Sequence, residues 1–93
     1  MEYFFVYMLQ CKDDSYYIGQ TDNIERRLSE HSEGLSEYTK IRRPVELVFL
    51  ENCQTREAAF ELERKIKKWS RKKKQALIEK NWNKISYFAK KKF

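Results

Sequence analysis

Apolar and aromatic residues open the chain in an unbroken run over residues 3–9, and a shorter apolar segment covers residues 16–19. A strand buried on both faces has the first pattern, because a half-exposed strand alternates apolar and polar positions. The polar stretch 12–15 between the two segments is typical of a tight turn. The pattern predicts two paired strands, the first of them central in a sheet with helices on both sides.

Two tyrosines of this hairpin are candidates for a shared site. If the turn is centred near Lys12, Tyr7 and Tyr17 become cross-strand neighbours on one face of the sheet. A slip of one residue would separate them, because successive side chains on a strand point to opposite faces. The predicted pairing is therefore a direct test of the hairpin register.

A helix start follows the second strand. Asp22 is the expected cap, and Glu25, three residues later, would complete a capping box. The helix is expected to run to about Glu33 and to stop at Gly34.

The side chains of this helix divide into a buried face and an exposed one. Ile24 and Leu28 mark the buried face. Arg27 and His31, four residues apart, lie at its edge, whereas Arg26 points away. Arg27 is thus drawn towards the interior and needs an anionic partner there, while Arg26 can be solvated.

The second half of the chain is predicted to hold one strand and two helices. Residues 35–44 form a polar, basic connection, and residues 45–50 form a third strand. Thr55 is expected to cap a helix that runs through Trp69, and another helix is expected over residues 71–80.

Glu63 lies on the flank of the apolar stripe of the helix that begins at Thr55, whereas Glu61 falls on the opposite side. The stripe is formed by residues at helical spacing: Ala59, Leu62, Ile66 and Trp69.

The predicted fold class is α/β in the broad sense and α+β in detail. It consists of a small three-stranded sheet, mixed or antiparallel, flanked by helices. The elements follow in the order β-β-α-β-α-α. The domain is expected to span residues 1–83, with a basic, aromatic tail over residues 84–93.

Charge is unevenly distributed along the chain. The 93 residues carry a net charge of +6, yet residues 1–63 hold 7 basic and 13 acidic side chains, while residues 64–93 hold 13 basic and one acidic. A basic end favours a polyanionic partner, because counterions released from phosphates contribute affinity whatever the base sequence. Nucleic acid is the preferred interpretation, and a solvated helical face that aids solubility is the alternative.

Cys11 and Cys53 are expected to be reduced, structural thiols, because a small domain built on disulfides holds more cysteine. With one histidine and no clustered ligands, a zinc site is not expected. No segment has the form of a signal peptide or the length to span a bilayer, so a cytoplasmic protein without membrane contact is expected.

Several of these segments resemble, in order and spacing, the GIY-YIG nuclease superfamily. The similar positions are Tyr7, Tyr17 to Gly19, residues 23–28 with His31, and Glu63 on a later helix. Two further segments, 42–45 and 66–71, are similar to the small stand-alone bacterial members of that superfamily.

The resemblance covers residues 3–83 and has one departure. Phe5 and Val6 stand where the first motif has a glycine and an isoleucine. Because Tyr7 remains, a change in packing is expected there rather than a loss of chemistry.

The resemblance implies a catalytic site with a bound metal. The positions it assigns to catalysis are Tyr7, Tyr17, Arg27, His31 and Glu63, with Glu63 as the ligand of Mg²⁺ or Mn²⁺. Substrate contacts are expected from Gly19, Arg42, Arg43, Lys67, Arg71 and Lys72. Asn81 is a weaker match to a polar residue that recurs near the site in some members.

Hydrolysis of a phosphodiester gives these groups distinct tasks. A divalent metal polarises the phosphate and stabilises the departing oxygen, and Mg²⁺ often takes only one or two protein carboxylates. Tyr7 is one candidate base, provided that its pKa is depressed, and His31 is the rival, with a better-matched pKa.

Other interpretations of these residues stay open. Glu63 also has the spacing for an ion pair with Lys67, four residues later. Arg42 and Arg43 are either phosphate contacts or simply solvated.

The sequence thus predicts a metal-dependent endonuclease that hydrolyses phosphodiester bonds, in DNA more than in RNA, with roles in repair or structure-selective processing. A nucleic-acid-binding module with the same fold and little intrinsic cleavage is the alternative, because the chain is small. A third interpretation is a basic protein that binds a ribosome or an acidic partner.

Overall fold

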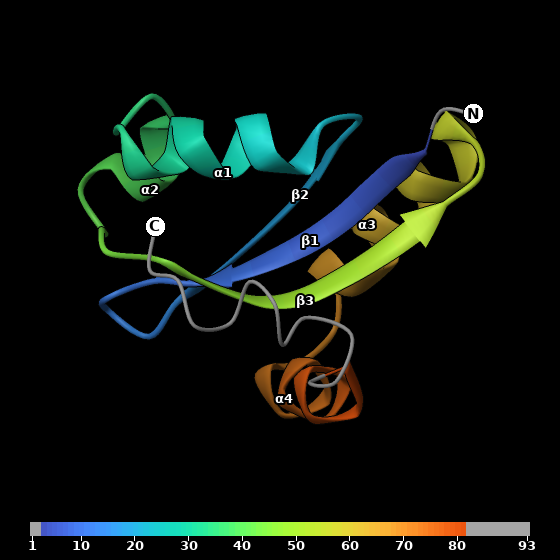
Figure 1. Ribbon diagram of the computed structural model, residues 1–93. Coiled ribbons are helices and arrows are strands. Elements are labelled where there is room, and N and C mark those ends of the chain that lie inside the picture. Colours follow the sequence, from blue (N-terminus) through green and yellow to red (C-terminus); the bar gives the residue numbers. More distant parts are fainter. Residues whose placement is uncertain (1–2, 82–93) are drawn as a thin grey trace.

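The fold of residues 3–81 is described by a computed structural model (Figure 1). The end of the predicted domain at 82–83 and the predicted tail 84–93 lie outside the described residues. The elements are β1 (Phe4–Gln10), β2 (Tyr16–Thr21), α1 (Ile24–Ser32), α2 (Glu37–Lys40), β3 (Glu46–Cys53), α3 (Arg56–Lys67) and α4 (Arg71–Asn81). Their order confirms the predicted one, with α2 as an addition inside the segment expected to be a connection.

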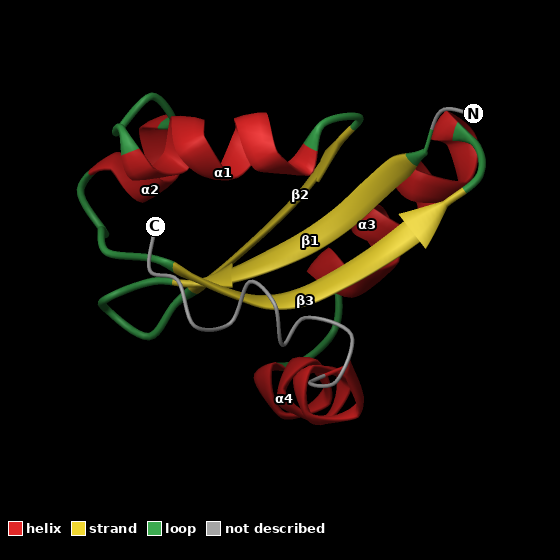
Figure 2. Cartoon of the chain, viewed as in Figure 1, coloured by secondary structure: helices red, strands yellow, loops and turns green. Residues whose placement is uncertain are grey.

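The three strands form one antiparallel sheet in the order β2-β1-β3. The helices lie on both faces of this sheet, with α1 and α2 on one side and α3 and α4 on the other (Figures 1 and 2). The central position predicted for the first strand is therefore confirmed. In the part of the chain from 3 to 81, no helix has the length and apolar character needed to cross a membrane.

Alternate residues of β1 pack into two separate hydrophobic clusters, one on each face of the sheet. Val6 and Met8 face α3, where they pack in one cluster with Ala59. Tyr7 and Leu9 face the other way and share a cluster with Leu28 of α1. Tyr7 therefore belongs to the α1 layer of the molecule.

The register of the hairpin differs by two residues from the predicted one. Tyr7 pairs with Gly19, and Tyr17 pairs with Leu9. The two tyrosines are thus diagonal rather than direct neighbours, but they stay on one face because a shift of two preserves the alternation. Their ring centroids lie 6.2 Å apart.

The turn itself explains the shift. Asp13 Oδ1 accepts hydrogen bonds from the backbone N–H and the hydroxyl of Ser15, at 3.0 and 2.6 Å. Asp14 adopts a left-handed conformation with φ of 68°, which aspartate tolerates better than most residues. The turn is therefore centred on Asp13 instead of Lys12.

The cap of α1 is Asn23, so the prediction of Asp22 was wrong. Asn23 Oδ1 accepts a hydrogen bond from the backbone N–H of Arg26 at 3.0 Å. The Thr21 hydroxyl accepts from Asn23 N–H and donates to its carbonyl, which holds Asn23 as the last extended residue before the helix. Asp22 forms an exposed ion pair with Arg26 instead. The helix ends as predicted, with Glu33 as its C-cap and Gly34 at φ of 80°.

The later elements agree with the sequence except at their ends. Thr55 caps α3, because its hydroxyl accepts from the N–H of Ala58 at 3.1 Å. The helix ends at Lys67, two residues before the predicted end at Trp69, because Lys68 is already the C-cap. The third strand covers Glu46–Cys53, longer at its end than the predicted 45–50.

Candidate active site

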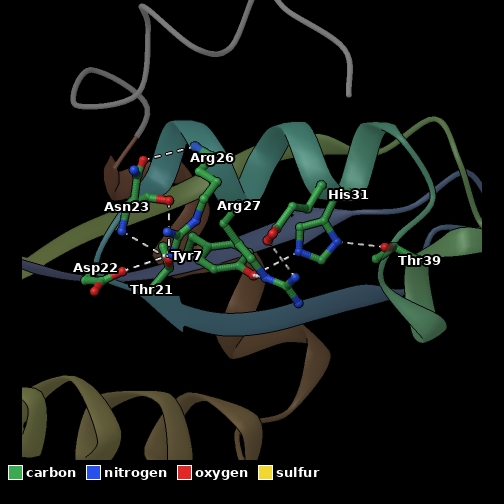
Figure 3. A network of polar contacts seen from close by, with 9 residues as sticks. Tyr7, Thr21, Asp22, Asn23, Arg26, Arg27, His31 and Thr39 are labelled. Carbon is green, nitrogen blue, oxygen red and sulfur yellow. Dashed lines mark hydrogen bonds and ion pairs between the residues drawn. The ribbon is translucent and has the colours of Figure 1, made fainter.

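The phenol of Tyr7 is the centre of a polar cluster under α1. Tyr7 has no exposed surface, and its oxygen accepts a hydrogen bond from Arg27 Nε at 3.2 Å. The same oxygen lies 2.9 Å from His31 Nε2 (Figure 3). Because Arg27 and His31 are four residues apart on α1, their side chains lie on the same face of the helix and both contact Tyr7.

His31 connects this cluster to α2. The imidazole is completely buried, and its Nδ1 lies 2.7 Å from the Thr39 hydroxyl (Figure 3). Both ring nitrogens are therefore paired, one with a strand and one with a helix. Sequence reasoning missed Thr39, because a lone threonine in a polar segment carries no periodic signal and α2 was not expected.

Tyr17 joins the cluster through ring contacts. Its ring centroid lies 5.0 Å from that of His31 and 5.7 Å from that of Tyr38. The guanidinium of Arg42 lies over the ring of Tyr38, 4.1 Å from its centroid. Tyr17 is thus held between α1 and α2, on the same face as Tyr7.

Gly19 makes room for the Tyr7 phenol. A Cβ atom at Gly19 would lie 2.6 Å from Tyr7 Oη and 3.1 Å from the Tyr17 ring. A glycine in a strand often marks a close approach of another group, and here the approaching group is the paired tyrosine itself.

Burial keeps both candidate bases neutral. It raises the pKa of Tyr7, with a further increase from neighbouring Tyr17, and the hydrogen bond from Arg27 only partly opposes this. Burial, together with the positive charge of Arg27, lowers the pKa of His31 to about 4. In the free protein at pH 7, Tyr7 is a phenol and His31 an uncharged imidazole.

Arg27 and Arg26 occupy different environments, as predicted. The Arg27 side chain is 28% exposed, and its Nη1 pairs with Glu30 at 3.2 Å. The Arg26 side chain is 62% exposed. Glu30 is an anionic partner of Arg27, but it lies on the same helix and is 35% exposed, whereas the sequence pattern required a partner in the interior.

Glu63 lies apart from this cluster. It belongs to α3, which packs on the opposite face of the sheet (Figure 1). Its side chain is only 12% exposed, and its Oε2 lies 3.7 Å from Lys67 Nζ. In the described part of the chain, no hydrogen bond or ion pair joins it to Tyr7 or Arg27.

The donor set fits one kind of metal and not another. Within residues 3–81 no group of three or more His, Cys, Asp or Glu side chains gathers as ligands, so a structural metal does not fit. A largely buried single carboxylate, Glu63, fits an ion such as Mg²⁺ that keeps several waters and takes further oxygens from a substrate.

The predicted substrate contacts fall into two groups. Arg42 donates from Nε to Asp13 and from Nη1 to the Tyr38 carbonyl. Arg43 donates to the carbonyls of Lys40 and Ser32. These two arginines therefore tie α2 to the hairpin turn and to the end of α1.

The second group lies on α3 and α4. Lys72 is exposed, Arg71 covers the ring of Tyr16 with its guanidinium 4.5 Å from the centroid, and Lys67 pairs with Glu63. Asn81 is the last residue of α4, and its side chain lies outside what the structure describes.

Both cysteines agree with the sequence-based expectation. Cys11 and Cys53 are buried and free. Burial raises the pKa of each thiol, which favours an inert thiol over a reactive thiolate.

Comparison with known proteins gives one family. The family model described as the GIY-YIG catalytic domain matches residues 3–76. The UPF0213 protein YazA of Bacillus subtilis is 44% identical over 80 residues, which cover 85% of this chain and 81% of that protein. A UPF0213 protein of Syntrophus aciditrophicus is 47% identical over 79 residues, covering 83% of this chain and 91% of the other.

Two solution NMR structures are similar in fold. The UPF0213 protein of Bacillus halodurans superposes with a TM-score of 0.56 at 37% identity, covering 83% of each chain. A protein of E. faecalis superposes with a TM-score of 0.61 at 38% identity, covering 86% of this chain and 90% of the other.

Proposed function

From the premise that the chain belongs to the GIY-YIG catalytic-domain family, a family of nucleases, we propose that it is a metal-dependent endonuclease that hydrolyses phosphodiester bonds in DNA. One observation carries the proposal: Arg27 Nε and His31 Nε2 both lie within hydrogen-bond distance of the Tyr7 oxygen. Processing of branched or damaged DNA belongs to this proposal as its expected use.

Arg27 supplies the charge that the reaction needs. Its side chain is partly exposed. Burial is the largest single influence on its pKa and lowers it, but the interactions with Tyr7, Tyr17 and Glu30 together outweigh burial and raise the pKa. A preorganised cation beside the phosphoryl oxygens contributes about 3–4 kcal/mol to lowering the barrier. Arg27 therefore binds the phosphate, and its bond to Tyr7 holds the phenol oxygen next to the reacting group.

Tyr7 and Tyr17 position the attacking water and the phosphate. The Tyr7 oxygen is fixed by two neighbours, so it can orient the attacking water by hydrogen bonding. Tyr17, packed against His31 at 5.0 Å, holds a phosphate oxygen or the water through its hydroxyl.

Glu63 is the residue that would hold the metal. A bound Mg²⁺ or Mn²⁺ polarises the phosphate and stabilises the leaving oxygen. In the free protein the Glu63 carboxylate is paired with Lys67, at 3.7 Å. Because this ion pair competes with a metal ion, we expect metal binding to be weak without substrate.

The N-terminal turn of α4 supports nucleic acid as the substrate. Four basic residues, 71–74, open this helix, and its first turn holds no acidic residue. Positive charges at a helix N-terminus oppose the helix dipole, so this arrangement disfavours the helix. An arrangement that is locally unfavourable for folding is expected at functional sites. A cluster of four basic side chains is suited to bind phosphate groups.

A binding module with little cleavage of its own is the second candidate. The separation of Glu63 from the Tyr7 cluster, with its carboxylate paired to Lys67, favours this alternative. It predicts DNA affinity that is unchanged by Glu63→Ala and Tyr7→Phe.

The test is a cleavage assay with Mg²⁺ and with Mn²⁺ on labelled duplex, branched and single-stranded DNA. Wild-type protein is compared with Glu63→Ala and Arg27→Ala. The proposal expects metal-dependent products that disappear in both variants. Equal cleavage by all three proteins would indicate a contaminant, and tight, salt-sensitive binding without any cleavage would favour the binding module.

A further inference from the structure

The Thr39 hydroxyl is as deeply buried as the imidazole it contacts. Neither Thr39 nor His31 has exposed surface, and Thr39 Oγ1 lies 2.7 Å from His31 Nδ1. Among residues 3–81 this is the one hydrogen-bond partner of that hydroxyl. Whether Thr39 donates or accepts in this hydrogen bond decides whether His31 donates a hydrogen bond to the Tyr7 oxygen or accepts one from it.

A buried hydroxyl hydrogen needs an acceptor, and leaving it unpaired is costly. For Thr39 the available acceptor is His31 Nδ1, so Nδ1 carries a lone pair rather than a hydrogen. An uncharged imidazole has one N–H. Its hydrogen therefore sits on Nε2, the nitrogen that lies 2.9 Å from the Tyr7 oxygen.

We propose that Thr39 is a positioning residue that fixes the tautomer of His31, so that His31 Nε2–H donates a hydrogen bond to the Tyr7 oxygen. Arg27 Nε donates to the same oxygen at 3.2 Å. Two donors stabilise the charged form of a phenol against the effect of burial. Tyr7 is then the group that orients the attacking water, and His31 supports it as a donor.

The opposite tautomer would reverse these roles. With the hydrogen on Nδ1, His31 would donate to Thr39 and accept from Tyr7, which would make the imidazole the base. The hydroxyl hydrogen of Thr39 would then have no partner in a fully buried position. In the proposed tautomer both hydroxyl hydrogens have an acceptor, because the phenol hydrogen of Tyr7 is free to go to the Tyr17 hydroxyl, an interaction that helps to raise the pKa of Tyr7. This difference makes the proposal measurable without substrate or metal.

The catalytic meaning of the tautomer rests on the proposed function, whereas the tautomer itself does not. His31 is the single histidine of the sequence, so an untagged, nitrogen-15-labelled protein gives one set of imidazole signals. The proposal expects a protonated Nε2 and an unprotonated, hydrogen-bonded Nδ1. A protonated Nδ1 in the wild-type protein would overturn it.

Two variants identify the hydroxyl as the cause. Thr39→Val keeps the shape and removes the donor, so the Nδ1 signal should move downfield to the position of an unbonded nitrogen. Thr39→Ser keeps a donor and should leave that signal near its wild-type place. The backbone amide spectrum of each variant verifies folding. An Nδ1 signal unmoved by Thr39→Val would also overturn the proposal.

Kinetics then separate positioning from packing. Thr39→Val should lower kcat about tenfold to a hundredfold, by analogy with the loss seen when the partner that orients a metal-binding imidazole is removed, with KM unchanged and with activity recovered in Thr39→Ser. Equal losses in both variants, or a change in KM alone, would contradict the positioning role. If the wild-type protein cleaves nothing, the proposed function fails, and the nitrogen-15 spectra still decide the role of Thr39.

Discussion

The phenol oxygen of Tyr7 lies where a side chain on Gly19 would be. A Cβ atom on Gly19 would come within 2.6 Å of Tyr7 Oη and 2.8 Å of the ring carbon that carries it. Real Cβ atoms do not approach other atoms this closely, so either the phenol or the strand must move. The pair Tyr7–Gly19 thus couples the geometry of the candidate site to the packing of two strands.

Gly19→Ala should therefore displace the phenol. Overpacking of this kind costs about 1–3 kcal/mol of stability, and the moved oxygen should lose its contacts with Arg27 and His31. Urea unfolding and the cleavage assay together measure both effects. Gly34→Ala provides the comparison, since Gly34 is a glycine at φ of 80° away from Tyr7 and should affect stability without abolishing cleavage. Full activity in Gly19→Ala would show that the position of the phenol is unimportant.

Arg27→Ala should abolish most of the cleavage, and Arg26→Ala should not. The two arginines are neighbours on α1, yet only Arg27 reaches the Tyr7 oxygen. Removal of a preorganised charge lowers kcat roughly a hundredfold to a thousandfold. Steady-state kinetics of the two variants on one DNA substrate give the comparison, and equal losses would assign the effect to overall charge.

Glu63→Gln should remove the metal dependence of cleavage, whereas Glu61→Gln should leave it intact. Both residues lie on α3, but Glu61 is exposed and Glu63 is largely buried. The measurement is the rate as a function of Mg²⁺ concentration. If both variants respond to Mg²⁺ as the wild-type protein does, Glu63 is only the ion-pair partner of Lys67.

Stability should fall between about pH 6.5 and pH 4 because of His31. Its pKa is lowered from 6.5 to about 4 by burial and by Arg27, so in this range the unfolded chain binds a proton that the folded protein does not. The loss is complete near pH 4 and amounts to at most about 3 kcal/mol. Urea unfolding across this range, compared with His31→Gln, measures it, and the variant should show a flatter dependence. An identical slope in both proteins would assign the loss to other groups.

Lys72→Glu should change stability and DNA binding in opposite directions. A negative charge in the first turn of α4 stabilises the helix by about 0.3–1 kcal/mol, while removal of a phosphate contact weakens binding and reduces its salt dependence. Lys80→Glu, in the last turn, should instead destabilise the helix. Thermal unfolding and binding titrations at several salt concentrations distinguish these effects; unchanged binding in Lys72→Glu would place the DNA elsewhere.

The sequence predicted the architecture because its signals are local and periodic. The unbroken apolar run of β1 indicated a central strand, and the spacing of Arg27 and His31 placed both at the edge of a buried face. The hairpin register depended on the conformation of Asp14 and the hydrogen bonds of Asp13, which composition alone does not reveal.

The candidate site was predictable only in part, for a physical reason. Tyr7, Arg27 and His31 lie on regular elements, so their faces follow from periodicity. Thr39 is buried by a helix of four residues, too short to leave a repeating pattern. Its contact with His31 depends on how the chain folds back against α1 after Gly34. That packing is part of the tertiary structure and leaves no local signal in the sequence.

The central place of β1 also decides which parts of the site can adjust. Its backbone is hydrogen-bonded to strands on both sides, so the sheet holds the backbone of Tyr7 in place. The phenol oxygen is in turn held by Arg27 and His31. The parts that can move are the long side chain of Arg27 and the short helix that carries Thr39. If a molecule binds at this cluster, we therefore expect α1 and α2 to adjust rather than the sheet.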